Sequence, residues 1–201
     1  MRDGRLLLNG QTADRQPRLL LTDAADGLSG WKPSVIPPNS IFTFPEPTWF
    51  QRPGGSLVML FRTRSGHLRL CASVSDNRGE TWSAPLETNF PDATARSFAG
   101  NLPDGTAFIV SNPSTTPSTY PTIGRRIPLT LSLSADGITF DRAYVVRGEP
   151  TRMRFQGKSK LDGWQYPSAV VWRDWLYIAY SINKEDVGVT RIRLAGIIHG
   201  T

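Results

Sequence analysis

Hydrophobic runs that follow a turn residue recur along the chain at a regular spacing. The runs occupy residues 5–8, 56–60, 106–110 and 175–179. The step from Gly4 to Gly54 and the step from Gly55 to Gly105 are each 50 residues. Short apolar runs bounded by turn residues predict strands. A fixed period of this size predicts a fold built from repeats.

A second apolar segment follows each of the first three runs and ends in a polar turn and an aromatic residue. These segments span residues 18–31, 68–82 and 128–140. The clearest turns are residues 75–82 (Ser-Asp-Asn-Arg-Gly-Glu-Thr-Trp) and residues 134–140 (Ser-Ala-Asp-Gly-Ile-Thr-Phe). Ser, Asp and Asn side chains bind backbone amides in tight hairpins, and Gly supplies a positive φ. We therefore expect fold-stabilising hairpins, with the aromatic packed between sheets, rather than calcium loops.

A further short strand is predicted before each of the last three runs. These leading strands cover residues 46–50, 96–100 and 166–171. Units of three or four antiparallel strands, repeated about every 50 residues, are typical of β-propeller blades. We therefore predict an all-β propeller with four-stranded antiparallel blades, of which about three and a half are present. The predicted blades are residues 1–38, 39–90, 91–148 and 164–198, within one partial domain over residues 1–201.

Composition agrees with this interpretation. The chain contains 18 Gly and 16 Pro, which shorten helices and mark turns. The one long stretch without either, Ser168–Val187, alternates like a strand, so a helical bundle is not expected. A hydrophobic content of 39% predicts a packed core. No apolar run approaches the roughly 18 residues needed to span a bilayer, so no membrane partner is expected.

Charge and metal-binding residues narrow the candidate partners. The formal net charge of +6 suits an anionic partner. No RNA-binding motif accompanies that charge, so nucleic acid is not expected. The single cysteine, Cys71, excludes an intrachain disulfide and a thiolate metal cluster, and two histidines are too few for a His-based zinc site. We therefore expect neither a metal nor a cofactor.

The polar turns resemble the Asp-boxes of sialidases (neuraminidases) and related BNR-repeat proteins. Residues 75–82 match Ser-x-Asp-x-Gly-x-Thr-Trp with Asn77 in place of the Asp, and residues 134–140 match a version one residue shorter. An ordered set of segments accompanies them, namely Ser-Asn-Pro at 111–113, Arg-Ile-Pro-Leu at 126–129, Gln-Tyr-Pro-Ser at 165–168 and Leu-Tyr-Ile-Ala-Tyr at 176–180. The resemblance covers about residues 19–194 and is to the C-terminal part of a six-bladed sialidase-like propeller.

The resemblance implies an exo-α-sialidase-type glycoside hydrolase in a truncated form. Its substrate would be an anionic glycan or sialoglycoconjugate, from which it releases a terminal acidic sugar. Tyr166 would be the nucleophile, because a neutral phenol avoids repulsion by the substrate carboxylate. Arg126 would bind that carboxylate with its planar fork, and the neighbouring Arg125 is the alternative for this role.

Position along the predicted strands adds further candidates. The inner strands of propeller blades converge at one end of the axis, so Glu46, Arg96 and Tyr166 are expected to meet there. A tyrosine nucleophile needs a nearby base, normally Glu, which makes Glu46 its catalytic partner. Arg96 is the second substrate-binding arginine, and Arg62 reaches the same cavity. The family's general acid is an Asp on an early blade, upstream of the segments present here.

Two other functions stay open at this point. One is a non-catalytic propeller that binds acidic glycans. The other is a uronic-acid-directed propeller hydrolase or lyase, in which the tyrosine accepts a proton and the arginines hold the carboxylate. Open propeller edges favour association into a homo-oligomer. The first 18 residues are too poor in apolar residues for a signal peptide, whereas the resemblance implies that full-length relatives are secreted or periplasmic.

Overall fold

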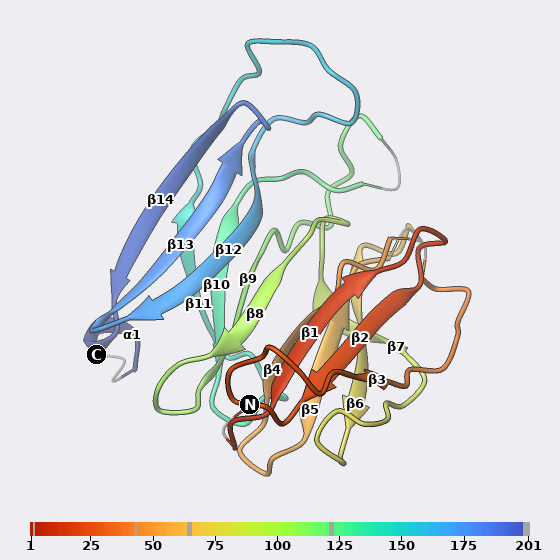
Figure 1. Ribbon diagram of the computed structural model, residues 1–201. Coiled ribbons are helices and arrows are strands. Elements are labelled where there is room, and N and C mark those ends of the chain that lie inside the picture. The colour runs from red at the N-terminus through yellow and green to blue at the C-terminus, as the bar shows by residue number, and fades with distance from the viewer. Residues whose placement is uncertain (2, 43, 64–65, 121–122, 199–201) are drawn as a thin grey trace.

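Short strands joined by tight turns form nearly all the regular structure of the computed structural model, which describes residues 1, 3–42, 44–63, 66–120 and 123–198 (Figure 1). Within these residues, fourteen strands form four antiparallel sheets, and α1 (Ala195–Ile198) is the single helix. The predicted all-β class is confirmed. No helix in the described part of the chain is long and apolar enough to cross a membrane.

Each sheet is a meander in which consecutive strands pair. The first sheet contains β1 (Leu6–Gln11), β2 (Pro17–Thr22) and β3 (Lys32–Ser34). The second contains β4 (Thr48–Gln51), β5 (Leu57–Phe61), β6 (Arg69–Ser75) and β7 (Leu86–Pro91). The third contains β8 (Phe98–Asn101), β9 (Ala107–Ser111), β10 (Leu129–Ser134) and β11 (Arg142–Arg147). The fourth contains β12 (Trp164–Trp172), β13 (Trp175–Ile182) and β14 (Asp186–Arg193).

The turn after β6 is held by its own polar side chains. The Ser75 hydroxyl accepts a hydrogen bond from the Gly79 amide at 2.9 Å, and Asn77 Oδ1 accepts one from the Thr81 amide at 3.0 Å. Gly79 has a φ of 83°, as expected for the glycine of such a turn. Trp82 follows, is 5% exposed, and donates from its indole nitrogen to the Ser34 hydroxyl on β3 at 2.8 Å. The turn therefore joins the second sheet to the first.

The turn after β10 is built in the same way. The Ser134 hydroxyl accepts a hydrogen bond from the Gly137 amide at 2.8 Å, and Asp136 accepts from the amides of Ile138 and Thr139 at 2.7 and 2.8 Å. These amides, together with the Ser134 hydroxyl, lower the pKa of Asp136 to about 2. The carboxylate is thus a fixed acceptor of the hairpin rather than a group free for other work.

Three hydrophobic clusters lie between successive sheets. The first joins Leu19 of β2 to Leu57 of β5, and the second joins Leu60 of β5 to Ile109 of β9. The third joins the third sheet to the fourth, through the side chains Leu129, Leu131, Leu133, Leu176, Ile178 and Tyr180. The four sheets are therefore packed face to face in chain order.

The leading strands β4, β8 and β12 lie next to one another. Side chains replace ladder hydrogen bonds between β4 and β8: the Thr48 hydroxyl accepts from the Ala99 amide at 2.7 Å, and the Asn101 amide group bonds both backbone groups of Gln51 at 2.8 Å. In Figure 1, β8 and β12 both run away from the end of the molecule where the loop over residues 148–163 and the segments 112–120 and 123–128 lie. This arrangement brings the segments that precede the leading strands to one end.

Candidate functional site

A cavity of about 280 Å³ lies at the end where the leading strands begin. Glu46, Arg96 and Tyr166 all line it, together with Pro47 and the end of β1 at residues 9–11. Glu46 and Arg96 stand two residues before β4 and β8, respectively. Three residues that are 50 and 70 positions apart in the chain are thus brought to a single cavity, as the strand pattern predicted.

Tyr166 is placed by a β-bulge. The expectation that it opens the strand is wrong by two residues, because β12 begins at Trp164. Gln165 pairs with Ser181 and Ser168 pairs with Ala179, so Tyr166 and the following proline oppose one residue of β13. Tyr166 also has a φ of 56°, which is unusual for a residue with a side chain. Bulges of this kind re-aim a side chain, and here the half-buried phenol is turned toward the cavity.

Glu46 is paired with a buried arginine. Arg62 Nε lies 2.8 Å from Glu46 Oε2, and Arg62 is 7% exposed. Arg62 also donates from Nε to the Phe44 carbonyl at 3.1 Å and from Nη1 to the Thr94 carbonyl at 3.2 Å. Arg62 follows β5 directly. The backbone of Glu46 has a positive φ of 37°. Strained backbone at Glu46, Thr94 and Tyr166 is what a functional site commonly contains.

Arg126 is a buried cation whose guanidinium group is only partly hydrogen-bonded within the described residues. It is 5% exposed, and its Nη2 donates to the same Thr94 carbonyl that Arg62 uses, at 3.2 Å. Its Nε and Nη1 have no hydrogen-bond partner among the described residues. Burial lowers the pKa of Arg126, while the nearby Tyr166, Asp92 and Glu46 act in the opposite direction. Two guanidinium groups thus converge on one carbonyl, and one of them keeps donors for an anion.

The backbone of Arg126 is fixed by a buried asparagine. Asn112 is fully buried, and its side-chain nitrogen donates to the carbonyls of Arg126, Pro128 and Trp164 at 3.0, 2.9 and 2.9 Å. The Trp164 amide in turn donates to the Arg126 carbonyl at 3.0 Å. The end of β9, the segment before β10 and the start of β12 are therefore tied together. This links the placement of Arg126 to the strand that carries Tyr166.

Gly163 permits the close approach of these two segments, and its replacement has a definite expected outcome. A Cβ at this position would lie 2.5 Å from both the Cβ and the carbonyl oxygen of Arg126, and its φ is +125°. We expect Gly163→Ala to lower the free energy of unfolding by about 3 kcal/mol through strain and displacement of Arg126. Urea unfolding measures this.

Gly54→Ala is the matched control for that substitution. Gly54 is exposed, and a Cβ there would meet nothing within 4 Å. The free energy of unfolding of the Gly54→Ala protein should stay within about 0.5 kcal/mol of that of the parent. A Gly163→Ala protein as stable as the Gly54→Ala protein would show that the contact with Arg126 can relax freely.

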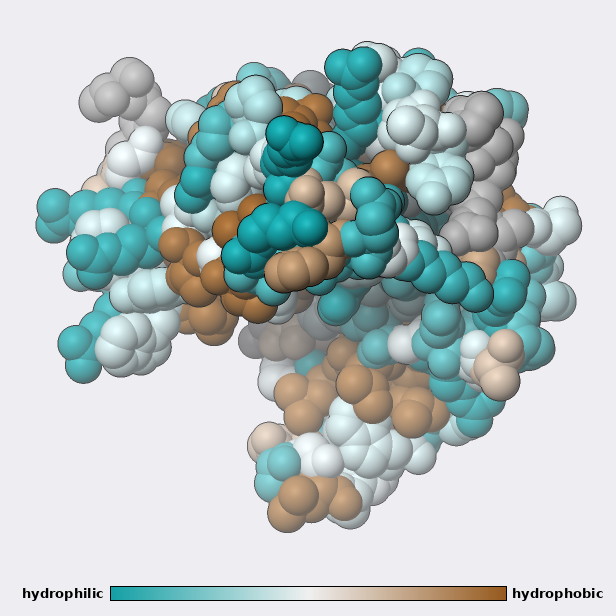
Figure 2. Space-filling view, turned by 90° about the horizontal axis from the view of Figure 1, so that it is seen from above, coloured by the Kyte–Doolittle hydropathy of each residue, from teal (hydrophilic) through white to brown (hydrophobic). Residues whose placement is uncertain are grey.

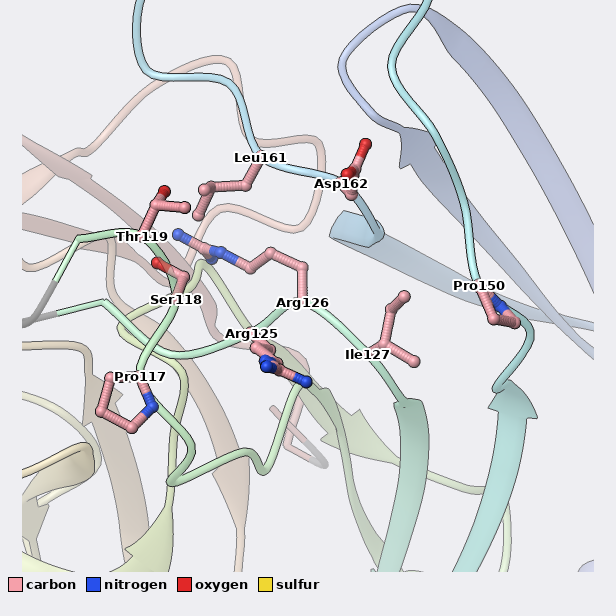
Figure 3. Close-up of a pocket in the computed structure, with 9 residues that line it drawn as sticks. All are labelled: Pro117, Ser118, Thr119, Arg125, Arg126, Ile127, Pro150, Leu161 and Asp162. Atoms are coloured by element: carbon pink, nitrogen blue, oxygen red, sulfur yellow. The ribbon is translucent and has the colours of Figure 1, made fainter.

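The remaining predicted arginines lie outside the buried pair. Arg96 is exposed at the rim of the cavity that contains Glu46 and Tyr166. Arg125 is also exposed, and it lines a neighbouring cavity of about 590 Å³ with Arg126. Figure 3 shows the two side chains leaving the chain in different directions, with Arg126 extending toward Thr119 and Leu161. Arg96 therefore shares a cavity with Glu46 and Tyr166. Arg62 does not line that cavity but forms an ion pair with Glu46, and Arg126 lines the neighbouring cavity.

Sequence reasoning missed three residues of this region. Asp92 is 1% exposed and interacts electrostatically with both buried arginines, while Asn112 donates a hydrogen bond to the Arg126 carbonyl at 3.0 Å. Lys184 places its ammonium 4.9 Å from the centre of the Tyr166 ring. Their local sequences are those of ordinary turns, except that Asn112 belongs to the Ser-Asn-Pro segment noted above. Among these three residues, only Asn112 therefore had a sequence feature that pointed to the site.

Comparison with known proteins gives a consistent result. The family model of the BNR repeat-like domain matches residues 1–178. A solved sialidase is 32% identical over an alignment that covers 74% of this chain and 13% of its own, with a TM-score of 0.61. None of the curated proteins matches the chain.

Two more distant structures share the fold. A leech intramolecular trans-sialidase, solved with 2,7-anhydro-Neu5Ac, is 15% identical with a TM-score of 0.70; the alignment covers 98% of this chain and 30% of that one. An intramolecular trans-sialidase from Ruminococcus gnavus, in complex with oseltamivir carboxylate, is 16% identical with a TM-score of 0.68, over 95% of this chain and 41% of that one. The chain thus spans less than half the length of each of these three proteins.

Proposed function

The chain belongs to the family of BNR repeat-like domains with a sialidase-like fold, and we propose that it carries part of a sialidase active site. The proposed reaction is the release of a terminal acidic sugar, of the sialic acid type, from a glycan. The neighbours named above are sialidases and trans-sialidases, and the cavity beside Tyr166 has the cationic side chain of Arg96 at its rim.

The observation that carries this proposal is the state of Arg126. A buried cation with unsatisfied donors is costly for the fold, because it loses hydration without gaining a full set of partners. Two donors of Arg126 are in that state beside the second buried arginine, Arg62. A ligand carboxylate would satisfy them in the bidentate geometry that guanidinium groups favour. Among the described residues, nothing satisfies these two donors, so they remain open to an anionic ligand.

The proposed chemistry assigns one role to the two buried arginines and one to each of Tyr166 and Glu46. Arg62 and Arg126 bind the sugar carboxylate and so place the anomeric carbon beside Tyr166. The Tyr166 oxygen forms a bond to that carbon while its proton passes to Glu46, and the bond to the leaving oxygen breaks. Water then attacks the anomeric carbon with overall retention of configuration. The bond to the Tyr166 oxygen breaks, Glu46 returns its proton to that oxygen, and the proton lost by water passes to the acid that had protonated the leaving oxygen. Protonation of the leaving oxygen is assigned to the family's upstream Asp rather than to a residue described here.

We further propose that the four sheets are consecutive blades of a six-bladed propeller. The three clusters between successive sheets and the side-by-side leading strands support this. Figure 2 shows a notch between two parts of the molecule with hydrophobic side chains on both sides. A partial propeller of this kind is expected to associate with other copies through its open faces, and size-exclusion chromatography with light scattering measures that association.

The direct test is incubation with 3′-sialyllactose, followed by proton NMR. Release of sialic acid that appears first as the α-anomer supports a retaining sialidase, and first appearance of the β-anomer refutes it. Binding without release supports the non-catalytic glycan-binding function instead. An unsaturated product that absorbs in the ultraviolet, formed from a uronic-acid oligosaccharide, would identify the lyase alternative.

A further inference from the structure

Lys184 lies in a tight turn whose backbone would suit glycine better. The turn joins β13 to β14, and the Glu185 amide donates to the Ile182 carbonyl across it at 2.9 Å. The two central residues, Asn183 and Lys184, have φ values of 56° and 59°. Turns with two positive φ angles favour Gly at the second central position, because a side chain is strained there. A lysine at this position therefore points to a use for its side chain.

The Lys184 side chain lies over the ring of Tyr166. Its ammonium is 4.9 Å from the ring centre, within the roughly 6 Å over which an aromatic face attracts a cation. Both residues line a further cavity of about 560 Å³, whereas Lys184 does not line the cavity of about 280 Å³ that Tyr166 shares with Glu46. The ammonium thus reaches the phenol ring without occupying the space proposed for the sugar.

The loop over residues 148–163 holds the ammonium in this place. Lys184 Nζ donates a hydrogen bond to the Ser159 carbonyl at 2.8 Å. The preceding residue binds the same loop, because Asn183 Oδ1 accepts a hydrogen bond from the Gly163 amide at 2.8 Å. Gly163 directly precedes β12, the strand that carries Tyr166. Although Lys184 is exposed, its backbone and its ammonium are therefore both fixed relative to the Tyr166 ring.

The charge of Lys184 is not neutralised by the acids beside it. Glu185 Oε1 lies 2.6 Å from Lys160 Nζ, and Asp186 Oδ2 lies 2.6 Å from Arg154 Nη2. Within the part of the chain that the structure describes, Lys184 forms no ion pair, and its hydrogen bond goes to a neutral carbonyl. The two acids are thus matched by two other cations, which leaves the ammonium free to act on the phenol.

We propose that Lys184 is a positioning residue whose ammonium stabilises the negative charge that develops on the Tyr166 oxygen during the reaction. This inference rests on the proposed function, since it takes Tyr166 as the nucleophile. The charge arises when the phenol proton passes to Glu46, and again when the bond between the anomeric carbon and the Tyr166 oxygen breaks. Because a phenol oxygen shares its charge with the ring, a cation over the ring face lowers the energy of both transition states.

The first test compares variants that remove one charge each. Lys184→Met should lower kcat for release of sialic acid from 3′-sialyllactose by about fivefold and change KM by less than about twofold. Lys184→Arg should restore most of kcat, since a guanidinium also stacks on aromatic faces. Lys158→Met, at an exposed lysine of the same loop, should behave as the parent. An unchanged kcat in Lys184→Met, or an equal loss in Lys158→Met, would overturn the proposal.

Lys184→Gly separates this role from a role in folding. Glycine adopts the backbone conformation of the turn without strain, so the free energy of unfolding in urea should stay the same or rise. The kcat should nevertheless fall as it does in Lys184→Met. A loss of stability that parallels the loss of kcat would assign the lysine to the fold and refute the proposal.

A second measurement does not depend on turnover. Tetranitromethane nitrates ionised phenols, so its rate of reaction at Tyr166, followed at pH 8 by peptide mass spectrometry, reports the effect of the ammonium directly. We expect nitration of Tyr166 to be about fivefold slower in Lys184→Met than in the parent or in Lys158→Met. Slower nitration in a chain that releases no sialic acid would support the effect of Lys184 while refuting the sialidase. Equal or faster nitration would refute the inference, even where the parent is active.

Discussion

Replacing Tyr166 by Phe is expected to lower kcat for release of sialic acid from 3′-sialyllactose by about a thousandfold or more. The substitution removes the attacking oxygen and little else. The Phe ring keeps the stacking position under the Lys184 ammonium and the bulge formed with Pro167. KM should change by less than about tenfold, because the carboxylate is bound by Arg62 and Arg126 rather than by the phenol.

The matched control for this substitution is Tyr177→Phe on β13. Tyr177 lies against Trp172 and does not line the cavity that contains Tyr166. Its loss of a hydroxyl should leave both kcat and KM close to those of the parent. Initial rates from the NMR assay give kcat and KM for the parent and both variants, and circular dichroism verifies that the variants are folded. Full turnover by Tyr166→Phe would remove the tyrosine from the mechanism.

Much of the fold was predictable because its signals are local. The 50-residue period follows from turn glycines and apolar runs, and the hairpins after β6 and β10 follow from Ser, Asx and Gly side chains that act within a few residues. The outer strands β7 and β11 were not predicted individually. Their residues are mostly exposed or half-buried, so they carry no strong hydrophobic alternation.

The candidate site was predictable only in part, because its contacts join distant segments. Strand starts pointed to Glu46, Arg96 and Tyr166, and the structure does gather them. The shared use of the Thr94 carbonyl by Arg62 and Arg126 depends on how two loops cross, which no local pattern encodes. The bulge had one sequence signal, since Pro167 lacks the amide that a regular ladder requires.

Asp92 shows the same limit more sharply. The sequence Phe-Pro-Asp-Ala-Thr at residues 90–94 is typical of an exposed turn, yet the carboxyl group is buried. Its burial results from β7 ending against the crossing loops, where the Ala93 amide bonds the Asn112 carbonyl at 2.9 Å and the Gly124 amide bonds the Ala93 carbonyl at 3.1 Å. Only the assembled fold shows that this acid faces the arginines.

Arg126 and Arg125 offer the sharpest test of the carboxylate site, since they are adjacent in sequence and differ in burial. We expect Arg126→Met to lower kcat/KM by about a hundredfold or more, because a buried, charge-assisted contact to the substrate is lost. Stability should change little: Met is close in size to the buried stem, and Asp92, deprived of one cation, takes up a proton.

Arg125→Met is expected to leave kcat/KM within about threefold of the parent, because the side chain is exposed and its contribution is screened by solvent. The reverse pattern, with activity lost on replacing Arg125 and kept on replacing Arg126, would move the carboxylate into the neighbouring cavity lined by Ser118 and Asp162. The burial of Arg126 would then be purely structural, and its two unpaired donors would need another explanation.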